Sequence, residues 1–187
     1  MRHERSPAAR DRIIGAALRI VAHGGVHRAT MAAIAESAGV SKALLHYHFA
    51  DRDTLLSHVV LRLGERTAHR ERRALDREGL APIDALWQWC SDELERGELR
   101  ALVQLGLLDE PVLSSAAANV QSQRLASANR TIGELFVRLS LNPRLATALI
   151  AATHLTFIDG LATSRVDLEE ARRRFDVFWL ANLTLGD

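Results

Sequence analysis

The chain has 187 residues, of which 48% are hydrophobic and 25% charged, and its formal net charge is +1 at pH 7. The composition is that of an ordinary globular protein, and the length allows one or two domains. No stretch approaches the roughly 18 apolar residues of a membrane span, and the basic N-terminus lacks a signal-peptide pattern. The single cysteine, Cys90, excludes an internal disulfide, so we expect a cytoplasmic protein with no membrane partner.

Positive charge is concentrated at the start of the chain. Residues 1–52 contain eight Lys and Arg against four Asp and Glu, which gives +4, and the remaining sixteen basic and nineteen acidic residues give −3. Five of the eight histidines also lie in this segment. A basic head on a mildly acidic body is suited to binding phosphates, although an ordinary solvated surface would explain the same counts.

Helical patterns cover the sequence and strand patterns are nearly absent, because Ala, Leu, Arg and Glu dominate. The first predicted helix spans about residues 8–23 and ends at Gly24-Gly25. Two short helices follow, at about residues 31–38 and 42–48. The sequence therefore predicts an all-α fold that opens with three helices.

The two short helices form a distinct pattern in residues 30–49, TMAAIAESAGVSKALLHYHF. Thr30 and Ser41 are suited to cap the helix N-termini through their side-chain oxygens. Gly39 can supply the positive φ that a tight turn between helices requires. The segment predicts a helix-turn-helix, a unit that presents its second helix to the DNA major groove. A helical hairpin without a nucleic-acid role is the alternative.

The segment GVSKALLHYHF resembles the recognition-helix signature of TetR-family transcriptional regulators. That signature is Gly-Val-Ser, a variable pair, an aliphatic pair, Tyr, a variable residue, His or Tyr, and Phe. The resemblance extends upstream through RDRIIGAALRIVAHGG and downstream through ADRDTLLSHVV, so its specific part covers about residues 10–60. The chain departs from the pattern where the family's usual Tyr is His46 and where a frequent Gly is Ala43.

The resemblance implies that the helix at about residues 42–48 enters the major groove. Lys42 could then donate to guanine, whereas Ala43 and Leu44 offer only van der Waals contact. His46 can bind a phosphate, more tightly when it is protonated, so DNA affinity would depend on pH. The candidates for phosphate contact are Thr30, Ser41, Tyr47, His48 and Arg52.

Six further helices are predicted for the body, about nine in all. The fourth helix begins at a capping residue, Asp51, and runs to about Gly79. The fifth begins with Pro82 in its first turn and ends at Gly97. A short sixth helix spans about residues 98–108.

The last three predicted helices form the C-terminal half of the body. The seventh begins at Asp109-Glu110-Pro111. The eighth begins with Asn142 as cap and Pro143 as first helical residue, and it runs to about Arg165. The ninth spans about residues 167–185.

The resemblance also implies a small-molecule pocket between the fourth and eighth helices. Gln121 and His154 lie on otherwise apolar helical stripes, and burying such groups costs free energy unless a partner, such as a ligand, satisfies them. A satisfied core role or simple exposure is the alternative for each residue. We expect a mostly apolar ligand. The candidate ligand-binding residues are Trp87, Gln104, Gln121, Phe136, His154 and Phe157.

Small residues recur at every fourth position of the eighth helix, and the ninth helix has an apolar stripe. A row of small residues lets another helix approach closely, so these two helices could pair with the same two of a second subunit in a four-helix bundle. An ordinary monomer core is the alternative. The resemblance favours the dimer, because family members generally dimerise through their last two helices. The predicted interface residues are Ala152, Thr156, Gly160, Phe175, Phe178, Trp179 and Asn182.

The sequence contains no sign of catalysis. It has no Gly-x-Ser-x-Gly elbow, phosphate loop or dinucleotide fingerprint. Cys90 lies on an apolar stripe and is interpreted as a small hydrophobic residue. His46 and His48 have no Cys or carboxylate ligands at the spacing of a zinc site. We therefore expect no enzyme activity, no cofactor and no metal.

The leading hypothesis is a homodimeric TetR-like repressor that binds double-stranded DNA at a palindromic operator and is released by a small-molecule effector. Residues 1–52 would form the helix-turn-helix DNA-binding domain, and residues 53–187 the helical ligand-binding and dimerisation domain. The alternative is an all-α dimeric ligand- or protein-binding module without specific DNA binding, which the departures at His46 and Ala43-Leu44 keep open.

Overall fold

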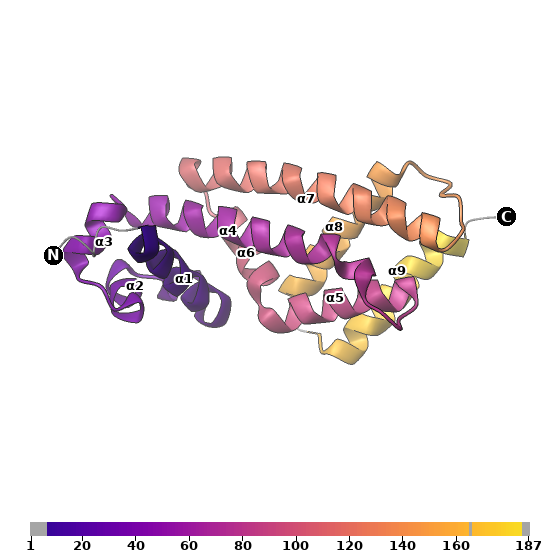
Figure 1. Ribbon diagram of the computed structural model, residues 1–187, viewed down its shortest axis with the longest axis horizontal. Helices are drawn as coiled ribbons and strands as arrows, with labels where there is room; N and C mark the ends of the chain where they lie inside the picture. The colour runs from indigo at the N-terminus through magenta and orange to yellow at the C-terminus, as the bar shows by residue number, and fades with distance from the viewer. Residues whose placement is uncertain (1–6, 165, 185–187) are drawn as a thin grey trace. The chain divides into compact units, whose positions relative to one another are not determined.

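The structure is a computed structural model and describes residues 7–164 and 166–184. Within these ranges the chain forms helices, turns and loops but no strand, so the predicted all-α fold is confirmed. None of the described helices combines the length and apolar character that crossing a membrane requires. In chain order the elements are α1 (Pro7–Gly24), η1 (Val26–Arg28), α2 (Met31–Ala38), α3 (Lys42–His48), α4 (Arg52–Arg72), η2 (Ala74–Asp76), α5 (Pro82–Arg96), α6 (Glu98–Gly106), α7 (Pro111–Arg138), α8 (Thr147–Thr163) and α9 (Leu168–Thr184) (Figure 1).

The helices gather into two compact units. Unit 1 comprises the described residues up to Glu65 together with Arg100–Val120, and unit 2 comprises Arg66–Leu99 and the described residues from Gln121 onward. Two helices, α4 and α7, therefore contribute residues to both units. The functional division between residues 52 and 53 that the sequence suggests stays a prediction.

Two helix boundaries differ from the prediction by more than two residues. The fourth helix ends at Arg72 and not at Gly79, and the chain continues into η2. In a continuing helix the carbonyl of Leu75 would accept from the N–H of Gly79, but here it accepts from the guanidinium of Arg138. Ala74 and Leu75 are buried in the core of unit 2, which holds the chain in this turn.

The eighth helix begins at Thr147, so the prediction that Pro143 is its first helical residue is wrong. Helix α7 ends with Ser140 in the left-handed region, at φ 56°, and with a bond from the N–H of Leu141 to the carbonyl of Phe136. This is the pattern of a helix C-terminal cap, and it places Asn142 and Pro143 in the loop that leaves α7. The predicted end of the ninth helix at Leu185 lies outside the described residues.

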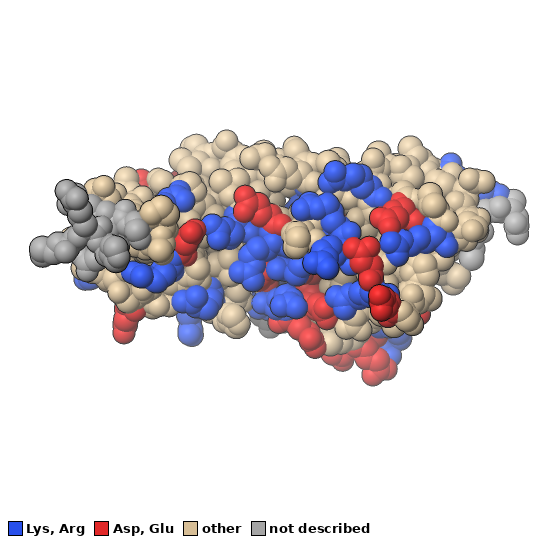
Figure 2. Space-filling model, viewed as in Figure 1, with Lys and Arg blue, Asp and Glu red and all other residues tan. Residues whose placement is uncertain are grey.

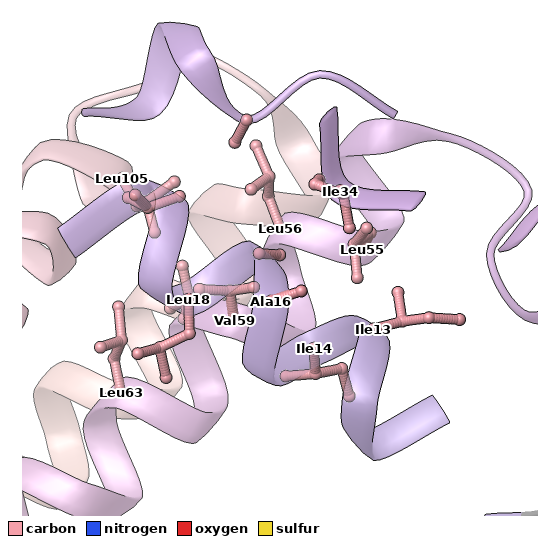
Figure 3. Packing of buried hydrophobic residues seen from close by; sticks show 14 of the residues in the cluster. Ile13, Ile14, Ala16, Leu18, Ile34, Leu55, Leu56, Val59, Leu63 and Leu105 are labelled. Atoms are coloured by element: carbon pink, nitrogen blue, oxygen red, sulfur yellow. The ribbon is translucent and has the colours of Figure 1, made fainter. Parts of the chain in front are cut away.

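The core of unit 1 is built on α4. Figure 3 shows side chains of α1, including Ile13 and Leu18, beside those of α4, including Leu56 and Val59. These positions follow the three- and four-residue spacing of one helix face. Fully burying an aliphatic side chain contributes about 1.5–3 kcal/mol, so this face holds α1, α2 and α3 on one support. The completely buried residues of α4 here are Leu55, Leu56, Val59, Val60 and Leu63.

Unit 1 also contains a close approach between α4 and α7 at Gly64. A Cβ atom on Gly64 would lie 2.4 Å from Cγ1 of Val120, far inside van der Waals contact. Valine is stiff at χ1 and cannot swing away freely. Glycine is therefore required at position 64 by packing.

We expect Gly64→Ala to lower the free energy of unfolding by about 1–3 kcal/mol, because overpacking forces side chains or backbone to shift. Urea unfolding would measure the change. Gly133→Ala on α7 is the matched control, since a Cβ there meets nothing within 4 Å. Adding Val120→Ala to Gly64→Ala should recover part of the loss, and a strictly additive double variant would contradict the steric explanation.

Candidate functional site

The predicted helix-turn-helix is present in unit 1 and its termini are capped as expected. The side-chain oxygen of Thr30 accepts from the N–H of Ala33 at 3.2 Å, and that of Ser41 accepts from the N–H of Leu44 at 3.1 Å. Gly39 adopts φ 63°, the left-handed conformation that the turn requires. These local bonds set the start of α2, the turn and the start of α3.

Helix α3 has one buried side and one exposed side. Leu45 is completely buried against the unit 1 core, and Leu44 is half-buried. The opposite side of this seven-residue helix lies in solvent and carries polar and small residues. The exposed members of the predicted DNA contacts are Ser41, Lys42, Ala43, His46 and Tyr47, with Thr30 exposed at the start of α2.

His48 and Arg52 are placed differently from the other predicted contacts. The ring of His48 is half-buried, lies 5.2 Å from the Tyr47 ring, and has a buried Nε2 without a hydrogen-bond partner among the described residues. Arg52 donates from Nε to the carbonyl of Ala29 at 2.9 Å and from Nη2 to the carbonyl of Val26 at 2.7 Å. Arg52 therefore ties the start of α4 to the loop that precedes α2, a role that the sequence did not reveal.

A second contact braces α1 against α4. Nη2 of Arg10 lies 2.9 Å from Nε2 and 3.1 Å from Nδ1 of His58, and its guanidinium lies over the ring of Phe49 at 5.3 Å. Burial, with a further contribution from Arg10, lowers the pKa of His58 below its ordinary value. His58 is therefore kept neutral, as an acceptor for the guanidinium requires.

The predicted ligand residues do not share one environment. Within unit 2, His154 is completely buried and Phe136 nearly so, whereas Trp87 and Phe157 are half-buried. The expectation that Gln121 faces inward is wrong, because it is exposed on α7. Gln104 is also exposed, and it lies in unit 1.

The buried polar residues of unit 2 include several that the sequence analysis did not predict. Arg124 is buried and forms a two-pronged ion pair with Asp159, with N···O distances of 2.5 and 3.0 Å. Glu71 and Ser127 are buried as well. The buried positions of α7 include three polar residues, Arg124, Ser127 and Thr131, as well as apolar residues such as Ile132 and Leu135. A search for apolar residues alone therefore misses part of the buried side.

Burial shifts the titration of two interior groups in opposite directions. Burial raises the pKa of Glu71 to about 7, against the opposing effect of Arg124. Burial and the neighbouring Arg124 lower the pKa of His154 to about 3. Neither ring nitrogen of His154 has a hydrogen-bond partner in the described part of the chain. His154 is therefore a neutral, unsatisfied imidazole at physiological pH.

We expect the parent protein to lose stability as the pH falls, and His154→Leu to lose less. Because the unfolded pKa of His is about 6.5 and the folded pKa is about 3, acidification below pH 6.5 protonates the unfolded chain first and destabilises the fold. The stability difference between variant and parent should grow by about 2–3 kcal/mol between pH 7.5 and 4.5, measured by urea unfolding. Glu71→Gln is the control of opposite sign, since Glu71 costs stability as pH rises towards 7. Equal acid sensitivity of parent and His154→Leu would contradict a buried neutral ring.

The predicted dimer residues divide into exposed and buried groups. Thr156 and Gly160 are exposed on α8, and Ala152, Phe178 and Asn182 are half-buried. Phe175 and Trp179 are completely or almost completely buried in the core of unit 2, where they pack with each other and with residues of α5 and α8. Their assignment to a subunit interface is wrong, because this subunit already covers them.

The site is a helix-turn-helix carried on an all-helical body, and comparison with known proteins shows which proteins this chain resembles. Residues 13–59 match the family model described as bacterial regulatory proteins, tetR family. Escherichia coli UidR, an HTH-type transcriptional regulator, is 34% identical over 84 residues, which cover 45% of this chain and 41% of UidR. Rhizobium meliloti BetI, another HTH-type transcriptional regulator, is 42% identical over 50 residues, 27% of this chain and 25% of BetI. These alignments thus span less than half the length of the curated relatives.

Solved structures match over nearly the whole chain. A transcriptional regulator from Rhodococcus sp. Rha1 has a TM-score of 0.74 at 20% identity, covering 95% of this chain and 97% of that one. Salmonella enterica GusR has a TM-score of 0.72 at 18% identity, with 94% and 95% covered. The transcriptional regulator FadR from Bacillus subtilis, in complex with stearoyl-CoA, has a TM-score of 0.69 at 16% identity, with 90% and 96% covered. Residues 13–59 are therefore similar to the tetR family of bacterial regulatory proteins, and the chain shares the fold of these solved structures.

Proposed function

We propose that this protein is a DNA-binding transcriptional repressor that acts as a homodimer on a palindromic operator. The observation that carries the proposal is the match of residues 13–59 to the tetR model, combined with a capped α3 whose outer face is exposed. The curated relatives UidR and BetI are both transcriptional regulators. The excess of basic residues in the first 52 positions supports binding to phosphates.

The exposed side of α3 supplies the proposed base contacts. Lys42, in the first turn, would donate to guanine O6 or N7, and Ala43 would meet a thymine methyl group. The oxygens of Thr30 and Ser41 already accept the capping bonds, but each hydroxyl hydrogen remains able to donate to a phosphate. Arg52 would act mainly by holding α4 against the loop before α2.

Lys42 is the only lysine of the sequence, so its substitution tests the assignment cleanly. We expect Lys42→Gln to weaken binding to a selected operator roughly 5- to 150-fold, since one good base contact is worth about 1–3 kcal/mol, and to change the base preference. Gel-shift titration after sequence selection would measure both. Arg19→Gln on α1 removes the same charge at an exposed site outside α3, and it should have a much smaller effect. Equal effects of the two variants, or none, would contradict readout by α3.

The proposed dimer forms through α8 and α9. The outer side of α8 carries Thr156 and Gly160, and large apolar side chains of the two helices lie in solvent. Leu149 is 52% exposed, Val177 68% and Leu180 61%. An apolar surface next to a row of small residues is suited to close helix packing with a second copy.

Gly160→Leu separates dimerisation from folding, because a Cβ at Gly160 meets nothing within 4 Å in the single chain. The variant should fold normally, and we expect a weaker dimer and weaker operator binding, since a large side chain would overpack the small-residue row. Sedimentation equilibrium and circular dichroism would measure assembly and folding. Ala126→Leu, at an exposed position of α7, is the control. An unchanged tight dimer would place the interface elsewhere.

The proposed regulator responds to a small molecule bound in unit 2. FadR from Bacillus subtilis, a structural neighbour, was solved with stearoyl-CoA. Helices α4 and α7 both contribute residues to the two units, and α4, which follows the helix-turn-helix directly, is the one through which we propose that binding is transmitted to the head. An effector releases DNA only if it prefers the arrangement that does not bind DNA, and operator DNA must then weaken effector binding by the same factor.

A further inference from the structure

A hollow of about 280 Å³ opens within unit 2 beside the C-terminal part of α4 and along α5. Its lining residues come from these two helices and from the segment between them. Figure 2 shows Lys and Arg side chains, interspersed with acidic ones, across the part of the molecule where α4 and α5 lie. The lining residues are His69, Arg70, Arg73, Arg77, Trp89, Asp92, Glu93 and Arg96.

Some of the lining charges already have partners in the fold. Both carboxylate oxygens of Glu93 accept from the guanidinium of Arg70, which also donates to Glu98 at 2.8 Å. Arg66 pairs with the other oxygen of Glu98 at 2.8 Å. Arg77 pairs with Asp92 at 2.7 Å. Two arginines and two glutamates thus neutralise one another in one network, and Arg77 and Asp92 form a separate neutral pair.

The remaining lining charges are all positive. Arg73 and Arg96 are exposed, and the structure gives neither side chain a hydrogen bond or ion pair among the described residues. The charge of Arg96 nevertheless acts on the nearby carboxylates of Asp92 and Glu93. His69 is also exposed at the edge of the hollow. Because four arginines line the hollow against the two carboxylates of Asp92 and Glu93, the lining has an excess of positive charge. Each guanidinium offers a planar set of donors that matches a carboxylate or a phosphate.

Trp89 adds an apolar wall with an unsatisfied donor. The residue is 4% exposed and lines the hollow, and its indole N–H has no acceptor in the part of the chain that the structure describes. A buried donor without an acceptor costs free energy, which a bound acceptor oxygen recovers. A flat ring also packs favourably against an indole.

We propose that this hollow binds a small aromatic oxyanion, held through its carboxylate or phosphate group by Arg73 and Arg96 and through its ring by Trp89. The excess of arginine over carboxylate in the lining sets the chemical class, since an uncharged molecule would gain no charge-assisted hydrogen bond from the two exposed guanidinium groups. The ligand proposed here is an anion, whereas the sequence led us to expect a mostly apolar molecule. An effect of this binding on operator affinity would depend on the DNA-binding function proposed above.

The test is a titration of the full chain with phenyl phosphate and with benzoate at constant ionic strength, followed by tryptophan fluorescence and calorimetry. We expect saturable binding of at least one aryl anion, weaker binding of inorganic phosphate, and no binding of the uncharged benzyl alcohol. Benzyl alcohol binding as tightly as the aryl anions would overturn the assignment of an anion site.

Substitutions then locate the site. Arg73→Gln and Arg96→Gln should each weaken aryl-anion binding roughly 10-fold or more, the range expected when one charged hydrogen-bond partner is lost. Arg130→Gln removes a charge from an exposed position of α7 that does not line the hollow, so it should bind as the parent does. Both lining residues are exposed, so the variants should fold, which thermal unfolding would verify. Unchanged binding by the double variant would overturn the proposal.

Operator binding in the same samples separates this proposal from the proposed function. Release of operator DNA by the aryl anion supports both. Binding of the anion without any effect on operator affinity supports the site and contradicts its proposed regulatory role. A chain that binds operator but no aryl anion overturns the anion site and leaves the DNA-binding proposal standing.

Discussion

The buried face of α4 is the constraint on which unit 1 depends. Its Leu55, Leu56, Val59, Val60 and Leu63 are all completely buried, and α1, α2 and α3 rest against this one helix. A two-helix motif as short as α2 and α3 cannot bury a sufficient core by itself, because its apolar side chains are few. Arg52 completes the support by donating to backbone carbonyls before α2, so the orientation of α3 is tied to the start of α4.

This arrangement changes how the basic charge of the head is to be understood. Arg10 contacts His58 and the Phe49 ring, and Arg52 contacts backbone carbonyls, so two of the basic residues serve the fold. In the proposed complex, phosphate contacts would therefore depend more on the capping hydroxyls of Thr30 and Ser41 than the charge count alone implies. Net charge therefore predicts the attraction to an anionic partner, but it does not identify the residues that touch it.

Unit 2 differs from unit 1 in that its interior contains ionisable side chains. Its interior holds the Arg124–Asp159 ion pair, a carboxyl group with a pKa of about 7 and an imidazole without hydrogen-bond partners among the described residues. Replacing buried ion pairs with apolar packing is often neutral or stabilising, so such groups are weak evidence of selection for stability. Perturbed and unsatisfied polar groups concentrate at functional sites, which agrees with the proposal that unit 2 binds a ligand.

The all-helical fold and the helix-turn-helix could be predicted from the sequence, because both depend on local signals. Thr30, Gly39 and Ser41 act within a few residues of their own positions, and helical spacing specifies the buried face of α1 and α4. The end of α4 could not be predicted in this way, because beyond its last turn the carbonyl of Leu75 accepts from Arg138, 63 residues away in the chain. Nor could the burial of Arg124 and the exposure of Gln121. A polar side chain can be buried in a core when a partner satisfies it, and the partner of Arg124 is Asp159, 35 residues away in the chain. The pattern of hydrophobic residues along the sequence does not reveal such a pair.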